Sequence, residues 1–167
     1  MLPPQEARAQ LAHARATGLV TLCHQAESRH GLPRSLLLAV ASRETNCRDV
    51  VGDFGHGRGV FQIDDRFHHD WLAENGAAGP GRTPPLGVAA ELAAALLVEA
   101  LAVAKRHELT GDKATKFAAS AYNAGLGGAL AGLRRGDSDL DTTGRDYGAD
   151  VVARMQTFRA LERAQRT

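Results

Sequence analysis

The chain has 167 residues, of which 44% are hydrophobic and 23% charged, so it can bury one sizeable core and is not typical of disordered proteins. Its formal net charge of +1 excludes the strong basic field with which nucleic-acid-binding proteins hold phosphates. A local patch at Arg134, Arg135 and Arg145 is interpreted as solvated surface. We therefore expect one globular domain over residues 1–167, without a nucleic-acid partner.

The first half of the chain combines helical periodicity with one glycine-rich loop. Two prolines precede a predicted helix from about residue 5 to 29, which stops near Gly31. Pro33 opens a second helix that runs to about residue 46, since proline is favourable in a first helical turn. Residues 47–67 form the glycine-rich loop, in which residues 60–64 (VFQID) are β-like and predict a small hairpin.

The second half is helical as well. A short helix at about 69–74 and a loop at 76–87 precede a long apolar helix at about 88–107. Glu91 and Glu99 interrupt its apolar run, which favours a buried central helix over a membrane span. Further helices are predicted up to Gly125, over 127–135 and over 149–165, with a polar loop before the last. The pattern predicts a mainly α fold with a small β element.

The number of cysteines and the first 18 residues indicate whether disulfide bonds and a secretory signal are expected. Cys23 and Cys47 are too few for a disulfide-dense scaffold, and no CxxC pair is present for zinc or redox chemistry. The two could pair, but two separate half-buried thiols are the favoured interpretation. The first 18 residues lack a basic segment followed by an apolar run, so no secretory signal is predicted.

Glu44 is a charged residue on an apolar helical face. At 100° per residue it projects from the same side as Leu36, Leu37 and Val40. Partial burial raises the pKa of a carboxyl group, and the negative end of the helix dipole acts in the same direction. Both effects favour a carboxylic acid that stays protonated near neutral pH, as a general acid requires. The alternative is a surface glutamate paired with a neighbouring arginine.

The loop after this helix carries two further carboxylates, Asp53 and Asp64. Four glycines surround them and permit tight turns and the close approach of a ligand to the backbone (Gly52, Gly55, Gly57 and Gly59). An acid that faces one or two carboxylates across a cleft is the arrangement used for glycoside hydrolysis. The same three carboxyl groups could equally bind a cation, and the residues alone leave this alternative open.

Four sequence blocks carry a specific resemblance. They are ASRE (41–44), GDFGHGRGVFQID (52–64) with DRFH directly after it, SAYNAG (120–125) and TTGRDYGADVVARMQ (142–156). In order and spacing they resemble the goose-type lysozymes, within the lysozyme and lytic transglycosylase superfamily. The resemblance implies an α+β lysozyme-like fold, with a catalytic core over about 30–160 and a small β element beside a substrate cleft. Neither cysteine falls on the positions of the paired cysteines of vertebrate members.

The resemblance also implies roles for individual residues. Glu44 is implied as the catalytic acid, and Asp53 and Asp64 as the groups that hold and activate the attacking water, which would give inversion at the anomeric carbon. Tyr122 is expected to bond or pack near Glu44. No metal and no cofactor are expected. The positions implied to line the substrate cleft are Phe61, Gln62, His68, Tyr122, Asn123 and Tyr147, and for each aromatic a packing role alone remains the alternative.

The function that the resemblance implies is a peptidoglycan hydrolase, or muramidase, that acts as a monomer with an antibacterial or lytic role. It would cut the β-1,4 bond between N-acetylmuramic acid and N-acetylglucosamine. One alternative is a lytic transglycosylase that forms 1,6-anhydromuramic ends with Glu44 alone, and another is a non-catalytic glycan-binding domain. Asp53 and Asp64 favour hydrolysis, because a transglycosylase has no need to hold water.

We expect the protein to act on the cell wall, outside the cell or in the periplasm of a target cell. The sequence does not indicate the export route. Phage lysis, a secretion-system effector and a domain of a longer secreted chain are all compatible with the residues. An effector would imply an immunity or inhibitor protein that blocks the cleft.

Overall fold

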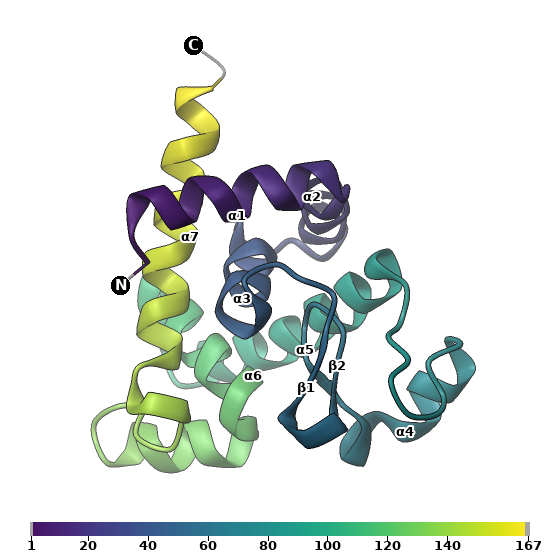
Figure 1. Cartoon of the computed structure of the whole chain (residues 1–167). Coiled ribbons are helices and arrows are strands. Elements are labelled where there is room, and N and C mark those ends of the chain that lie inside the picture. Colours follow the sequence, from purple (N-terminus) through teal and green to yellow (C-terminus); the bar gives the residue numbers. More distant parts are fainter. Residues whose placement is uncertain (1, 166–167) are drawn as a thin grey trace.

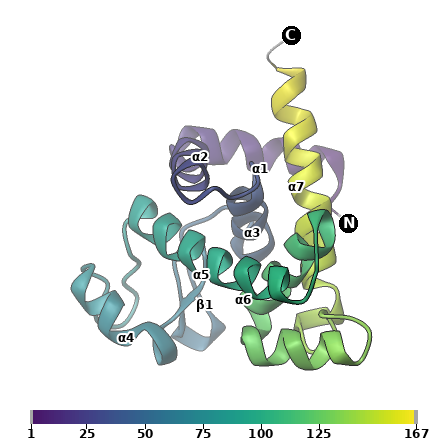
Figure 2. The ribbon, with the colours of Figure 1, turned by 180° about the vertical axis from the view of Figure 1, so that it is seen from behind.

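The computed structural model describes residues 2–165 and consists mainly of helices, with a small antiparallel sheet to one side of them (Figure 1; Figure 2 from behind). The predicted mainly α fold with a small β element is confirmed. The helices are α1 (Pro4–Ala16), α2 (Leu19–His30), α3 (Leu36–Thr45), α4 (Asp65–Glu74), α5 (Leu86–Arg106), α6 (Gly111–Arg134) and α7 (Tyr147–Ala164). The strands are β1 (Val51–Gly52), β2 (Gly57–Arg58) and β3 (Ile63–Asp64), with 3-10 turns η1 at Asp53–Gly55 and η2 at Thr143–Arg145.

The helix expected over residues 5–29 is in fact two helices, so that prediction was wrong. Gly18 adopts the left-handed conformation with φ of 77° and separates α1 from α2. An isolated glycine lowers helical propensity by only about 1 kcal/mol, so the sequence did not reveal the break. The helix end predicted at Gly125 is confirmed, because Gly125 interrupts α6 with φ of 74° and ψ of 161°.

Helix α3 is the centre of the fold and carries the first site residue at its end. Residues 36–42 are all buried, and the helix packs against α2, α5 and α7 (Figure 1). Its N-terminal end is held by Glu27, 3% exposed, whose carboxyl accepts hydrogen bonds from the backbone N–H groups of Ser35 and Leu37 at 2.9 and 2.8 Å. These bonds satisfy donors that a helix start leaves without a partner.

Helix α5 is the apolar segment of the sequence, and by length and composition it could cross a membrane. In this fold it packs against α2 and α6. Its buried residues recur three and four positions apart, the spacing of one helix face turned towards a core. They are Ala89, Ala90, Ala93, Ala94, Leu97, Ala100, Val103 and Ala104.

The sheet brings the two aspartates of the loop to the same place. Its strand order is β1-β2-β3, and Gly57 pairs with both Gly52 and Asp64. Asp53 follows Gly52 directly, so the chain delivers Asp53 and Asp64 to one end of the sheet. A side chain at Gly52 or Gly57 would displace the Gln62 amide, because the Oε1 atom of Gln62 lies 2.1 and 2.3 Å from where a Cβ would stand at these two positions.

Both cysteines are buried and unpaired, which agrees with two separate thiols, although they are more deeply buried than expected. Burial raises the pKa of both thiols, that of Cys47 to about 12.

Candidate active site

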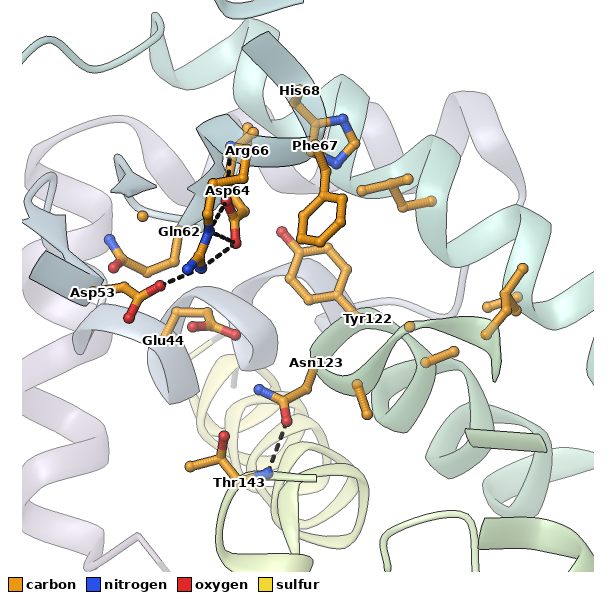
Figure 3. A pocket seen from close by; sticks show the side chains of 18 of the residues that line it. Glu44, Asp53, Gln62, Asp64, Arg66, Phe67, His68, Tyr122, Asn123 and Thr143 are labelled. Atoms are coloured by element: carbon orange, nitrogen blue, oxygen red, sulfur yellow. Dashed lines mark hydrogen bonds and ion pairs between the residues drawn. The ribbon is translucent and has the colours of Figure 1, made fainter. Parts of the chain in front are cut away.

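A cleft of about 760 Å³ lies between the helical part and the sheet (Figure 3). Helices α3, α5 and α6 line one side, and the sheet with the start of α4 lines the other. The volume is in the range of sites that take small molecules. Most of the residues predicted for the site line it: Glu44, Asp53, Gln62, Asp64, His68, Tyr122 and Asn123.

Glu44 lies in the last turn of α3 and points into this cleft (Figure 3). Burial raises the pKa of its carboxyl group to about 6, although the hydrogen bond from Tyr147 and the charge of Arg43 act in the opposite direction. At pH 6 such a group is half protonated, so it can donate a proton under conditions where an ordinary glutamate cannot.

Tyr147 lies behind Glu44 and not in the cleft lining, which corrects the position expected for it. It is 2% exposed, and its hydroxyl donates a hydrogen bond to Oε1 of Glu44. The guanidinium of Arg43 stands 5.6 Å from the centre of the Tyr147 ring and pairs with Asp146 and Asp150 at 2.9 and 3.2 Å. The start of α7 thus supports the last turn of α3.

A buried carboxylate, Asp139, holds the start of α7 in place. It accepts hydrogen bonds from the backbone N–H groups of Gly148 and Ala149 at 2.7 and 2.9 Å, and from the hydroxyl of Ser120 in α6 at 2.8 Å. Asp139 is 1% exposed and does not line the cleft. It therefore fixes Tyr147, and through Tyr147 the direction of Glu44.

Of the other two aromatic residues, Tyr122 packs near Glu44, one of the two arrangements expected for it, whereas Phe61 does not line the cleft. The hydroxyl of Tyr122 donates to the backbone carbonyl of Phe61 at 2.8 Å, so the residue bonded to Glu44 is Tyr147 and not Tyr122. Tyr122 does line the cleft and lies near enough for the Glu44 charge to contribute, after burial, to its raised pKa. Phe61 is fully buried and its side chain cannot contact a ligand in the cleft. Packing, the alternative considered for it, describes its position.

The sheet side of the cleft carries an ionic cluster (Figure 3). One nitrogen of Arg66, Nη2, donates to Oδ2 of both Asp53 and Asp64, each at 2.5 Å. Asp64 precedes α4 and also accepts the backbone N–H of Arg66 at 2.9 Å, as a helix cap does. The hydrogen bond from the Arg66 side chain is the largest cause that lowers the pKa of Asp64 below its usual range.

Sequence reasoning missed Arg66, although it stands in the block DRFH. Contact between positions 64 and 66 arises only because a helix begins between them, and contact with Asp53 depends on the sheet register. Of the described residues, no three His, Cys, Asp or Glu are grouped to hold a metal ion. The cation beside the two aspartates is Arg66.

Two of the remaining predicted residues, Gln62 and Asn123, make structural hydrogen bonds and also line the cleft. The Gln62 amide donates to the carbonyls of Val50 and Gly59 at 3.1 and 2.8 Å, so it holds the loop. Asn123 accepts the backbone N–H of Thr143 at 2.9 Å. His68 lines the cleft at an irregular position of α4, with φ of −124° and ψ of 27°.

A known protein is similar to most of the chain. Lysozyme g of Gallus gallus is 30% identical to the chain over 131 residues. This similarity supports the goose-type lysozyme family for the chain. The resemblance to goose-type lysozymes that the four sequence blocks indicate is thereby confirmed, as is the α+β lysozyme-like fold. The match covers 75% of this chain and 56% of the chicken lysozyme g, so the chain spans little more than half the length of that relative. No protein-family model matches the chain.

Proposed function

We propose that this chain is a peptidoglycan hydrolase that cleaves the β-1,4 bond between N-acetylmuramic acid and N-acetylglucosamine. The observation that carries the proposal is the contrast between carboxyl groups in one cleft. Glu44 is buried with a pKa raised to about 6, whereas Asp64 is held ionised beside Arg66. Two carboxyl groups with separated proton affinities are the arrangement that general acid and base catalysis of glycoside cleavage requires.

In the proposed reaction Glu44 donates its proton to the glycosidic oxygen as the bond from that oxygen to the anomeric carbon breaks. A water held by Asp53 and Asp64 on the opposite face attacks the anomeric carbon, and its proton passes to one of these carboxylates. The product is inverted at the anomeric carbon. This geometry would require a separation of roughly 6.5–9.5 Å between the acid and the base.

Further elements of the proposal concern the biological setting. Residues 1–167 would act as one monomeric catalytic domain on the cell wall, outside the producing cell or in a target periplasm, with an antibacterial or lytic role. Gln62, His68, Tyr122 and Asn123 would contact the glycan strand from the cleft walls. An immunity or inhibitor protein would act by covering the same cleft.

The proposal is tested by digesting purified peptidoglycan and identifying the products by mass spectrometry. Wild-type protein should release fragments with free reducing muramic ends, and Glu44→Gln should lower the rate by roughly 100-fold or more. Glu74→Gln, an exposed glutamate on α4, is the matched control and should behave as wild type.

Other products would point to the alternatives. Fragments lighter by one water carry anhydro ends and would indicate a lytic transglycosylase. Binding to peptidoglycan without any release would indicate a glycan-binding domain, and either result would contradict the hydrolase.

A further inference from the structure

We propose that Arg66 is a positioning residue that holds Asp53 and Asp64 together as one ionised pair on the water side of the cleft. The proposal deepens the hydrolase assignment and rests on it. It starts from a guanidinium shared between two carboxylates that belong to different elements, η1 and β3.

The contacts of Arg66 fix the relative position of the two carboxylates. Its Nε donates to both oxygens of Asp64, at 2.9 and 3.1 Å, while Nη2 donates to Asp64 and to Asp53 at 2.5 Å each. The rigid, planar guanidinium suits such a shared arrangement, because its donors stand in a fixed geometry.

Asp53 depends on this contact more than Asp64 does. Asp53 and the next residue, Phe54, both adopt left-handed backbone conformations, with φ of 46° and 52°, on a turn at the edge of the sheet. Within the described residues, the side-chain hydrogen bonds of Asp53 go to Arg66 alone, whereas Asp64 also caps α4. The Arg66 side chain therefore determines where the Asp53 carboxylate points.

Charge leads to the same conclusion. Four carboxyl groups line the cleft, and among the described lining residues Arg66 is the one arginine or lysine (Glu44, Asp53, Asp64 and Glu99 are the acids). Asp65, which adds negative charge next to Asp64, forms an ion pair with Arg58 at 2.6 Å and a hydrogen bond with His56 at 2.8 Å. His68 is the other titratable group that faces the cleft from α4. Without Arg66, the two aspartates would repel each other and one would retain its proton.

The test is the pH profile of peptidoglycan cleavage by wild type, Arg66→Gln and Arg66→Lys. In Arg66→Gln we expect kcat to fall roughly 100-fold, the cost of misplacing a catalytic group by about 1 Å. The acid limb should also move to higher pH, because a carboxylate that must be ionised would hold its proton longer. Arg66→Lys should return the acid limb to nearly its wild-type pH but should restore kcat less fully. An ammonium group supplies the positive charge without the planar donor geometry.

The matched control is Arg82→Gln, an exposed arginine in the loop before α5 that does not line the cleft. It should leave both limbs and kcat unchanged. An acid limb in Arg66→Gln identical to that of wild type would overturn the proposal, whatever the change in kcat. Circular dichroism should show unchanged helix content, because Arg66 is half exposed.

A second readout needs no catalysis and separates this inference from the proposed hydrolase. Carboxyl carbon shifts of Asp53 and Asp64 can be titrated by NMR in wild type and Arg66→Gln. A raised pKa of one aspartate in the variant would support the pairing even if the wild type releases no fragments. Unchanged titration of both would refute the pairing even if the wild type is an active hydrolase.

Discussion

The two walls of the cleft hold the same chemical group in opposite ways. On the helical wall, Glu44 is enclosed by packed side chains and bonded to a buried tyrosine hydroxyl, and burial raises its pKa to about 6. On the sheet wall, Asp53 and Asp64 are 50% and 26% exposed and share a guanidinium, which lowers the pKa of Asp64. The surroundings, and not the type of carboxyl side chain, give the two walls different proton affinities, as the proposed acid and water-holding roles require.

The largest effect is expected from removing the charge of the sheet wall. A double substitution, Asp53→Asn with Asp64→Asn, should lower the rate of peptidoglycan cleavage by about 10²- to 10⁴-fold, the usual contribution of a positioned base. Release of reducing ends measures this rate. Asp70→Asn, whose side chain is fully exposed on α4, serves as the control. A double variant with half of the wild-type rate would remove the water-holding role from this wall.

Stability should respond to pH through the buried glutamates, Glu27 and Glu44. Burial raises the pKa of Glu27 to about 7, so the folded protein keeps a proton that the unfolded chain releases above pH 4.5. The free energy of unfolding should therefore fall as pH rises from 4.5 to 7, by about 3 kcal/mol for Glu27. Asp64 acts with the opposite sign in a lower window, because its stabilisation is lost as the pH falls below its usual pKa of 3.8.

Urea denaturation at pH 5, 6 and 7.5 measures this dependence. Glu27→Gln should flatten the slope between pH 5 and 7.5, while Glu74→Gln should keep it. A wild-type free energy of unfolding that rises steadily over this range would show that Glu27 is ionised in the folded protein.

The hydrogen bond to Glu44 can be removed without touching the sheet wall. Because the Tyr147 hydroxyl favours the ionised form of Glu44, Tyr147→Phe should raise the pKa of Glu44 further and move the alkaline limb of the activity profile to higher pH. The loss of one buried hydrogen bond should also cost about 1 kcal/mol in the free energy of unfolding.

Tyr122→Phe is the matched comparison for Tyr147→Phe. It removes a hydroxyl bonded to the Phe61 carbonyl and should leave the position of the alkaline limb as in wild type. Equal shifts in the two variants would mean that the direct bond to Glu44 is not the cause.

The smallest effect concerns the glycines beneath the sheet wall. In Gly57→Ala, the new Cβ would stand 2.3 Å from Oε1 of Gln62 and displace its amide from Val50 and Gly59. We expect a loss of roughly 1 kcal/mol in thermal unfolding experiments, within the range for overpacking. Gly127→Ala in α6 meets open space, and it should stabilise the protein by up to about 1 kcal/mol. The same sign in both variants would contradict the packing described here.

The sequence predicted the features of the site that depend on residues close together in the chain. Helical periodicity was enough to place Glu44 on a buried face, and the glycines around Asp53 and Asp64 predicted tight turns in their loop. It did not identify the partner of Glu44, because Tyr147 stands 103 positions away and is placed by Asp139, which lies outside every recognised block. The contact of Arg66 with Asp53 was not predicted for a similar reason, because it depends on the register of three two-residue strands.

Asp139 carries a consequence for genetics. Its carboxylate joins Ser120 of one sequence block to Gly148 and Ala149 of another, yet it never meets the cleft. In a random mutagenesis screen for inactive alleles, substitutions of Asp139 should be recovered as often as substitutions of Glu44. If the fold persists, the expression level would be the same for the two classes of allele. Suppressor mutations that restore the position of α7 should rescue the Asp139 alleles and not the Glu44 alleles.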